Sequence, residues 1–118
     1  MRTKQASDFL NSSGIHTFNP LFFPLEMKTG SSVNVTGGTR NRGGVHTSYL
    51  RIITKEYHPE TAIEKSHEIK EYLQLNLKGA FFNGIKVLSV DADTPEPLYI
   101  GEENGVFTVS MNYTIIEG

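Results

Sequence analysis

The chain has 118 residues, of which 37% are hydrophobic and 20% charged, and its formal net charge is −2. This length and composition are typical of one globular domain, which we place over residues 1–118, and are too apolar for a disordered segment. The absence of cysteine excludes disulfide scaffolds, thiolate zinc sites and cysteine nucleophiles. No run approaches the roughly 20 apolar residues of a membrane span, and the start at residues 1–8 lacks the apolar stretch of a secretory signal.

Residues 3–12 predict a short N-terminal helix. Ala6, Phe9 and Leu10 fall on one side of it, and Gly14 provides the stop. A helix of this length is marginal alone, so it must pack on another element.

An extended apolar segment follows over residues 18–27. It contains Pro20 and Pro24, which cannot donate to a strand ladder. We therefore predict a segment that meets a sheet edge or wraps the core. Its aromatic side chains are expected in the core rather than on an exposed contact surface: Phe18, Phe22 and Phe23.

Residues 30–55 predict a long hairpin. Its second strand, residues 47–55, places Leu50 and Ile52 on one face. Paired glycines flank the tip at residues 37–44, which gives the backbone access to positive φ and predicts a mobile loop.

The strongest local pattern is an amphipathic helix over residues 59–78. Pro59 suits the first helical position, His58 opens the helix and Gly79 helps to end it. The apolar stripe advances by steps of a helical turn and predicts packing on a sheet: Ala62, Ser66, Ile69, Leu73 and Leu77.

Short strands close the chain at residues 85–90, 98–100 and 107–115, with a turn at residues 101–105. In the last strand apolar and polar residues alternate, which predicts one face on the core and one face in water. Together the elements predict an α+β fold. Its sheet is mostly antiparallel, with about four to five strands, and both helices pack on one face.

No motif of catalytic chemistry is present. The four histidines lie in separate contexts, so we expect solvated or capping roles rather than metal ligation: His16, His46, His58 and His67. No serine lies in a nucleophile elbow, and no pair of carboxylates shares a buried context. We therefore expect neither an enzyme nor a resident metal or cofactor.

Two loops fall short of ligand-binding motifs. Asp91, Asp93 and Glu102 match calcium-loop positions, but a proline and a glutamate stand where a ligand and an obligatory glycine belong. The tip at residues 37–44 lacks the Lys-Ser/Thr of a phosphate loop and leads into a strand. It is either a mobile basic loop that contacts a partner protein or nucleic-acid backbone, or a plain flexible turn.

Charge is distributed unevenly along the chain. Residues 28–48 carry three basic residues and no acid (+3), whereas residues 91–118 carry six acids and no Lys or Arg (−6). Opposite fields can dock within the fold or between copies, or form two solvated faces. The interface residues that we predict come from these segments: Arg40, Asn41, Arg42, Asp91, Asp93, Glu102 and Glu103.

Three stretches carry a resemblance to a known family. They are the glycine-rich segment 36–44, the segment 57–62 with the helical residues 66–73, and the closing strand 105–115. Their order resembles that of the tail terminator family of long-tailed bacteriophages. In phages of Gram-positive hosts this family is often called minor capsid protein.

The resemblance implies a structural virion protein rather than a catalyst. Tail terminators form hexameric rings at the head-proximal end of the tail tube, stop its polymerisation and offer a surface to the head connector. The implied partners are further copies of the chain, the tail tube protein and the head connector, with possible non-specific contact to DNA in the channel. The implied location is the head–tail junction of the virion, and the host cytoplasm during assembly.

Two alternatives remain open. One is a different head–tail joining protein of the phage neck. The other is a small sheet-based nucleic-acid binder that probes a groove with the basic hairpin, which aromatic residues on an exposed sheet face would favour. The expected outer face of the last strand carries no aromatic residue, which favours a protein partner. The residues of this face are Thr108, Ser110, Asn112 and Thr114.

Overall fold

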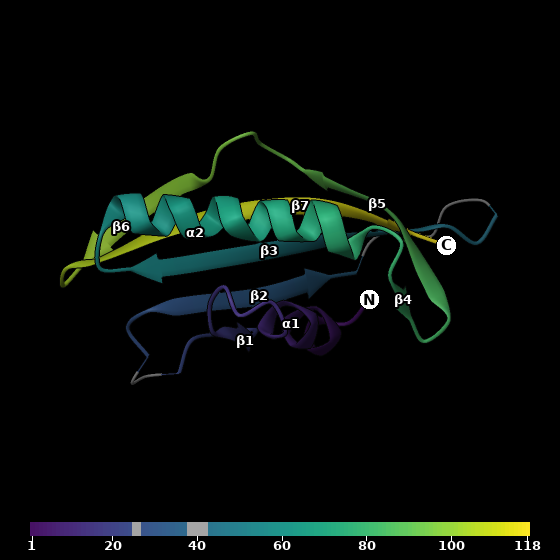
Figure 1. The fold of residues 1–118 in the computed structure, drawn as a ribbon, viewed down its shortest axis with the longest axis horizontal. Coiled ribbons are helices and arrows are strands. Elements are labelled where there is room, and N and C mark those ends of the chain that lie inside the picture. Colours follow the sequence, from purple (N-terminus) through teal and green to yellow (C-terminus); the bar gives the residue numbers. More distant parts are fainter. Residues whose placement is uncertain (25–26, 38–42) are drawn as a thin grey trace.

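The computed structural model describes residues 1–24, 27–37 and 43–118 (Figure 1). The helices are α1 (Thr3–Asn11) and α2 (Pro59–Tyr72), and α2 continues into a π-helical turn, η1 (Leu73–Leu77). The strands are β1 (Phe18–Pro20), β2 (Gly30–Thr36), β3 (His46–Glu56), β4 (Phe81–Phe82), β5 (Ile85–Ala92), β6 (Leu98–Glu103) and β7 (Val106–Glu117).

The strands form one sheet in the order β1-β2-β3-β7-β5-β4, and β6 pairs with β7 beyond the end of β5. Among the described strands, only β1 and β2 pair in parallel. The α+β class and the mostly antiparallel sheet are confirmed, but seven strands replace the expected four to five. The additional strands, β1 and β4, have three and two residues, too few to show a periodic pattern.

β3 and β7 form the central ladder of the sheet. Their pairing runs from His46 opposite Glu117 to Glu56 opposite Phe107. β2 pairs with the other edge of β3, which confirms the predicted hairpin. Most of its tip lies outside the described residues, so its expected mobility remains a prediction.

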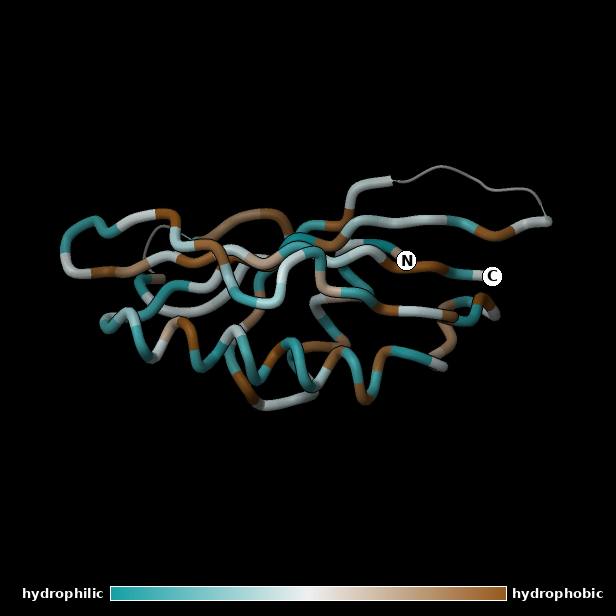
Figure 2. Tube along the Cα trace, turned by 90° about the horizontal axis from the view of Figure 1, so that it is seen from above, coloured by the Kyte–Doolittle hydropathy of each residue, from teal (hydrophilic) through white to brown (hydrophobic). Residues whose placement is uncertain are grey.

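Both helices lie on one face of the sheet (Figure 2). The whole predicted stripe of the long helix is buried, from Ala62 to Leu77. It shares one core with Leu10 of α1 and with Leu50 of β3, and the rings of Phe9 and Tyr72 lie 5.4 Å apart between the helices. Burial of this stripe holds the helices to the sheet through the hydrophobic effect.

The predicted helix over residues 59–78 is regular only as far as Tyr72. The side-chain amide of Asn76 donates to the carbonyl of Tyr72 at 3.0 Å. In an α-helix that carbonyl would take the backbone N–H of residue 76, so the side chain competes with the helical bond. The chain widens into η1 there and still buries Leu73 and Leu77.

The expectation of a fully buried aromatic segment is wrong for Phe22, which is 69% exposed. Phe18 is buried and Phe23 is half-buried. After β1 the chain adopts a positive φ at Leu21, whose N–H donates to Val33 at 2.8 Å. This turn directs the following residue away from the core.

The last strand confirms the predicted alternation on its core face, where Val109, Met111, Tyr113 and Ile115 are buried. The opposite face is not uniformly in water. Asn112 is exposed, but Ser110 is buried, and the Nε of Arg51 donates to its hydroxyl at 3.3 Å.

β6 runs three residues beyond the expected strand, and the turn that follows is shorter than expected. It consists of Asn104 and Gly105, both at positive φ, which is typical of a two-residue hairpin turn. The Asn-Gly pair is the sequence signal for this turn. The glutamates before it have low strand propensity and concealed the end of the strand.

The two ends of the described chain meet in a buried ion pair. The α-amino group of Met1 lies 2.8 Å from Oε2 of Glu117, and the Ser48 hydroxyl donates to Oε1 at 2.9 Å. This contact ties the start of α1 to the end of the central ladder. No helix of the described residues is long and apolar enough to cross a membrane.

We expect Tyr113→Phe to leave the free energy of unfolding unchanged or to raise it by up to about 1 kcal/mol. Tyr113 is fully buried, burial raises its pKa, and its hydroxyl has no hydrogen-bond partner among the described residues. Removing an unpaired buried hydroxyl removes a desolvation cost. Urea unfolding measures the change, with Tyr72→Phe as control. A loss above about 1 kcal/mol would contradict the unpaired state.

Candidate protein interface

Glu102 and Glu103 lie at one end of the sheet. Both are exposed, and Glu103 pairs with Val106 across the β6–β7 hairpin. Glu102 accepts the backbone N–H of Gly105 at 2.6 Å, which fixes the turn. The side chain of Glu103 has no hydrogen bond or ion pair with any described residue, so its charge is available to a partner.

Asp91 and Asp93 lie elsewhere. Asp91 pairs with Thr114 near the other end of β7, and Asp93 accepts the Thr114 hydroxyl at 2.8 Å. Because Val106 and Thr114 are eight residues apart on one strand, about 26 Å separates the two acidic pairs. The structure therefore divides the predicted acidic interface residues between two places.

Arg40, Asn41 and Arg42 lie outside the described residues, and the described chain stops on either side of them at Gly37 and Gly43. Gly37 follows β2 and Gly43 precedes β3, at the end of the sheet where His46 opposes Glu117. The ladder then runs ten residues to the end that carries Glu102 and Glu103, a span of about 33 Å.

This span excludes contact between the basic tip and Glu102 or Glu103 of the same copy. From their base, four extended residues of a loop reach only about 14 Å. Lys28 of the same basic segment lines a cavity with Glu103, so the span separates only the tip from these two carboxylates. Contact between the tip and Glu102 or Glu103 requires a second copy.

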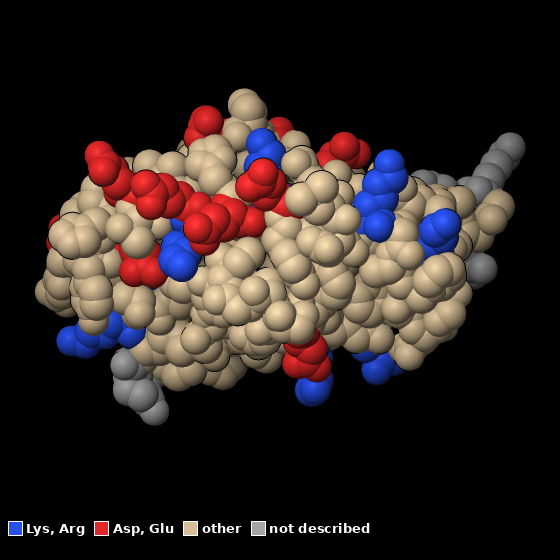
Figure 3. Space-filling model, viewed as in Figure 1, with Lys and Arg blue, Asp and Glu red and all other residues tan. Residues whose placement is uncertain are grey.

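Figure 3 shows the face on which α2 lies, with acidic side chains gathered over the half that contains β6 and the first turns of α2. The connection from β5 to β6 leans onto the helix there. His67 contacts Glu96 at 2.7 Å, and Lys70 donates to the carbonyl of Pro95 at 3.1 Å. His67 is partly exposed to solvent, as expected, and also has a specific partner.

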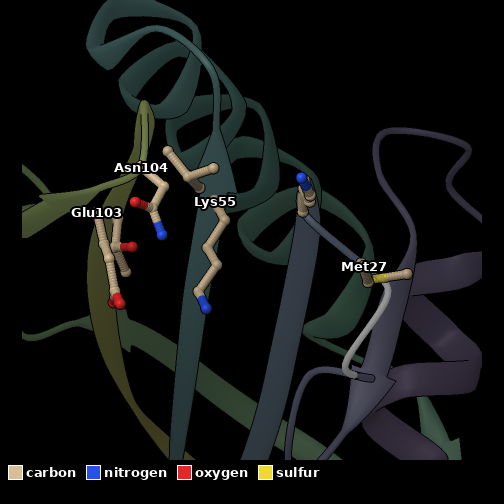
Figure 4. Close-up of a pocket in the computed structure, with 7 residues that line it drawn as sticks. Met27, Lys55, Glu103 and Asn104 are labelled. Atoms are coloured by element: carbon tan, nitrogen blue, oxygen red, sulfur yellow. The ribbon is translucent and has the colours of Figure 1, made fainter.

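A shallow cavity of about 210 Å³ lies on the sheet face that the helices leave open. It is lined by Met27 and Lys28 from the β1–β2 connection, Lys55 from β3, and Glu103 and Asn104 from the β6–β7 turn (Figure 4). The ammonium of Lys55 also lies 4.3 Å from the centre of the Phe23 ring. The cavity offers opposite charges side by side, which suits polar contact.

A buried polar chain has the residue types of a hydrolase triad. His16 Nδ1 lies 2.7 Å from the Ser31 hydroxyl, and His16 Nε2 lies 2.7 Å from the carboxylate of Glu56. Ser31 is fully buried and also bonded to Thr54 at 3.0 Å, so no substrate reaches its oxygen. The chain of bonds joins the segment before β1 to β2 and β3 and has a structural role.

The solvated or capping role expected for His16 is wrong. Its partners lie 15 and 40 residues away in the sequence, and only the alignment of β2 with β3 brings them together. No local sequence signal reveals such a contact. Among the residues that the structure describes, no three His, Asp or Glu side chains gather to hold a metal ion.

We expect Ser31→Ala to lower the free energy of unfolding by about 1–2 kcal/mol, because it removes the partner of His16 Nδ1 and of the Thr54 hydroxyl. Ser89→Ala is the control, and its change should stay within about 0.5 kcal/mol. Urea unfolding measures both. A covalent adduct of the wild-type protein with a fluorophosphonate at Ser31 would contradict the structural role.

Comparison with known proteins adds no family to these observations. No protein-family model matches the chain, and no curated protein matches it. The assignment of an interface therefore depends on the geometry and charges described above.

Proposed function

We propose that this chain is a structural assembly protein of the tail-terminator type. In this proposal, copies associate head to tail into a closed ring at the head-proximal end of a phage tail tube. The observation that supports it is that Gly37 and Gly43, the described residues on either side of Arg40 and Arg42, lie at the opposite end of one long sheet from Glu102 and Glu103. A head-to-tail contact between such ends closes into a ring when the rotation per copy permits.

The proposed contact pairs Arg40 and Arg42 of one copy with Glu102 and Glu103 of the next. Exposed ion pairs are each worth about 0–1 kcal/mol, so these charges supply orientation and register more than affinity. Their effect falls with salt, because ions screen exposed charges. Apolar surface at the same end must then supply most of the binding energy.

Asp91 and Asp93 do not belong to this contact, because they lie about 26 Å from the β6–β7 turn. We assign them to a second surface on the open side of the sheet. In the ring, that surface is available to the tail tube protein or to the head connector. A different neck protein would use the same two surfaces with other partners.

One observation favours the nucleic-acid alternative. The open face of β3, next to β7, carries Tyr49 and Arg51, both exposed. An aromatic ring and a guanidinium are groups on which bases stack. Asp91 and Asp93 near the same face repel phosphates, however, and a single ring offers little stacking surface, so a protein partner remains the proposal.

Charge reversal tests the head-to-tail contact. We expect Arg40→Glu/Arg42→Glu and Glu102→Lys/Glu103→Lys each to abolish self-assembly, because each variant brings like charges together at every contact. An equimolar mixture should assemble again with the two variants alternating, since each reversed end then meets an opposite charge. Native mass spectrometry distinguishes the variants by mass.

Glu64→Lys/Glu71→Lys is the matched control, with the same change of charge on the exposed side of α2, and should assemble as the wild type does. Assembly that survives reversal of both arginines would contradict the contact. Loss of DNA binding in that variant, with assembly intact, would assign the arginines to the DNA channel instead.

A further inference from the structure

β6 has one edge without a partner. Its inner edge pairs with β7, and no described residue hydrogen-bonds to the backbone of its outer edge. Three consecutive apolar side chains on this strand are exposed, Leu98 at 66%, Tyr99 at 54% and Ile100 at 49%. An open strand edge with apolar side chains is a template for an additional strand.

Parts of the other sheet edges are covered. Asn11 bonds both the N–H and the carbonyl of Phe18 in β1, and Thr3 bonds both backbone groups of Val35 in β2. On the opposite side, the backbone of Val87 in β5 bonds to the segment before β4. Among the described residues, the two-residue β4 and the end of β5 also have a bare edge, but both edges are shorter than that of the six-residue β6.

The simplest explanation of this edge is that its irregularity and its charges protect it against aggregation. The ladder is irregular between Tyr99 and Gly101, and Glu102 and Glu103 follow at once. Bulges and charges are common devices of that kind. Acidic residues, however, oppose pairing only with a strand of like charge. They repel the β6 of a second copy and attract a basic segment.

Within this chain the basic segment is known from the sequence. Residues 28–48 carry Lys28, Arg40 and Arg42 and no acid. The part between Gly37 and Gly44 begins about 33 Å from the β6–β7 turn of its own copy, too far to reach it. A second copy that approaches head to tail brings this segment to the edge of β6.

We infer that the outer edge of β6 binds the basic hairpin end of a second copy, which adds an extended segment to the sheet beside Leu98, Tyr99 and Ile100. The inference rests on the proposed head-to-tail assembly and gives its mode. Backbone hydrogen bonds and burial of the three side chains supply affinity. Glu102 and Glu103 then select the basic end over a second β6.

Disulfide trapping tests this mode directly, because the chain has no cysteine. Asn41→Cys and Ile100→Cys proteins are mixed, oxidised and separated on a non-reducing gel. We expect about tenfold more cross-linked dimer than from Asn41→Cys mixed with Leu75→Cys, because docking raises the local thiol concentration. Leu75 is 76% exposed, so this control is at least as open to random collision.

A yield no higher than that control would overturn the inference, as would a dominant Ile100→Cys homodimer. If closed rings form without the 41–100 cross-link, the inference fails and the proposed ring stands. If the cross-link forms in open chains that never close, the inference stands and the ring fails.

Discussion

The ladder between β3 and β7 is the constraint on which the rest of the structure depends. It runs unbroken from His46 and Glu117 to Glu56 and Phe107, and so sets the length of the molecule. Because side chains alternate along strands, it gives one face to both helices and leaves the other open. It also places the base of the basic hairpin and the β6–β7 turn at opposite ends of the sheet, so that a contact between them would join two copies head to tail.

The buried side chains of reactive types stabilise the fold. His16 is held between Ser31 and Glu56, and Glu117 is paired in the core with the amino group of Met1. Such buried groups are costly unless they are satisfied, and these contacts satisfy them. Among the described residues, the Tyr113 hydroxyl is a buried group without a partner. Other unpaired groups lie at the surface, on the outer edge of β6 and at Glu103 beside it, where a second chain can reach them.

The sequence predicts elements whose burial repeats. The stripe from Ala62 to Leu77 and the core face of β7 are buried as expected, because a periodic apolar face leaves a periodic signal. Contacts that depend on strand register leave no periodic signal in the sequence. The neighbours of His16 and the short strand β4 were therefore not predicted. The uneven charge was visible in the sequence, but only the ladder shows that Gly37 and Gly43, which flank the basic tip, lie about 33 Å from the β6–β7 turn.

The mass of the wild-type protein in solution tests the head-to-tail account most directly. Light scattering over a range of concentrations, at low and at high salt, separates monomers, closed rings and open chains. The account predicts a closed assembly of about six copies that weakens as salt screens the end-to-end charges. A monomer at every concentration, or an assembly that strengthens with salt, would contradict it.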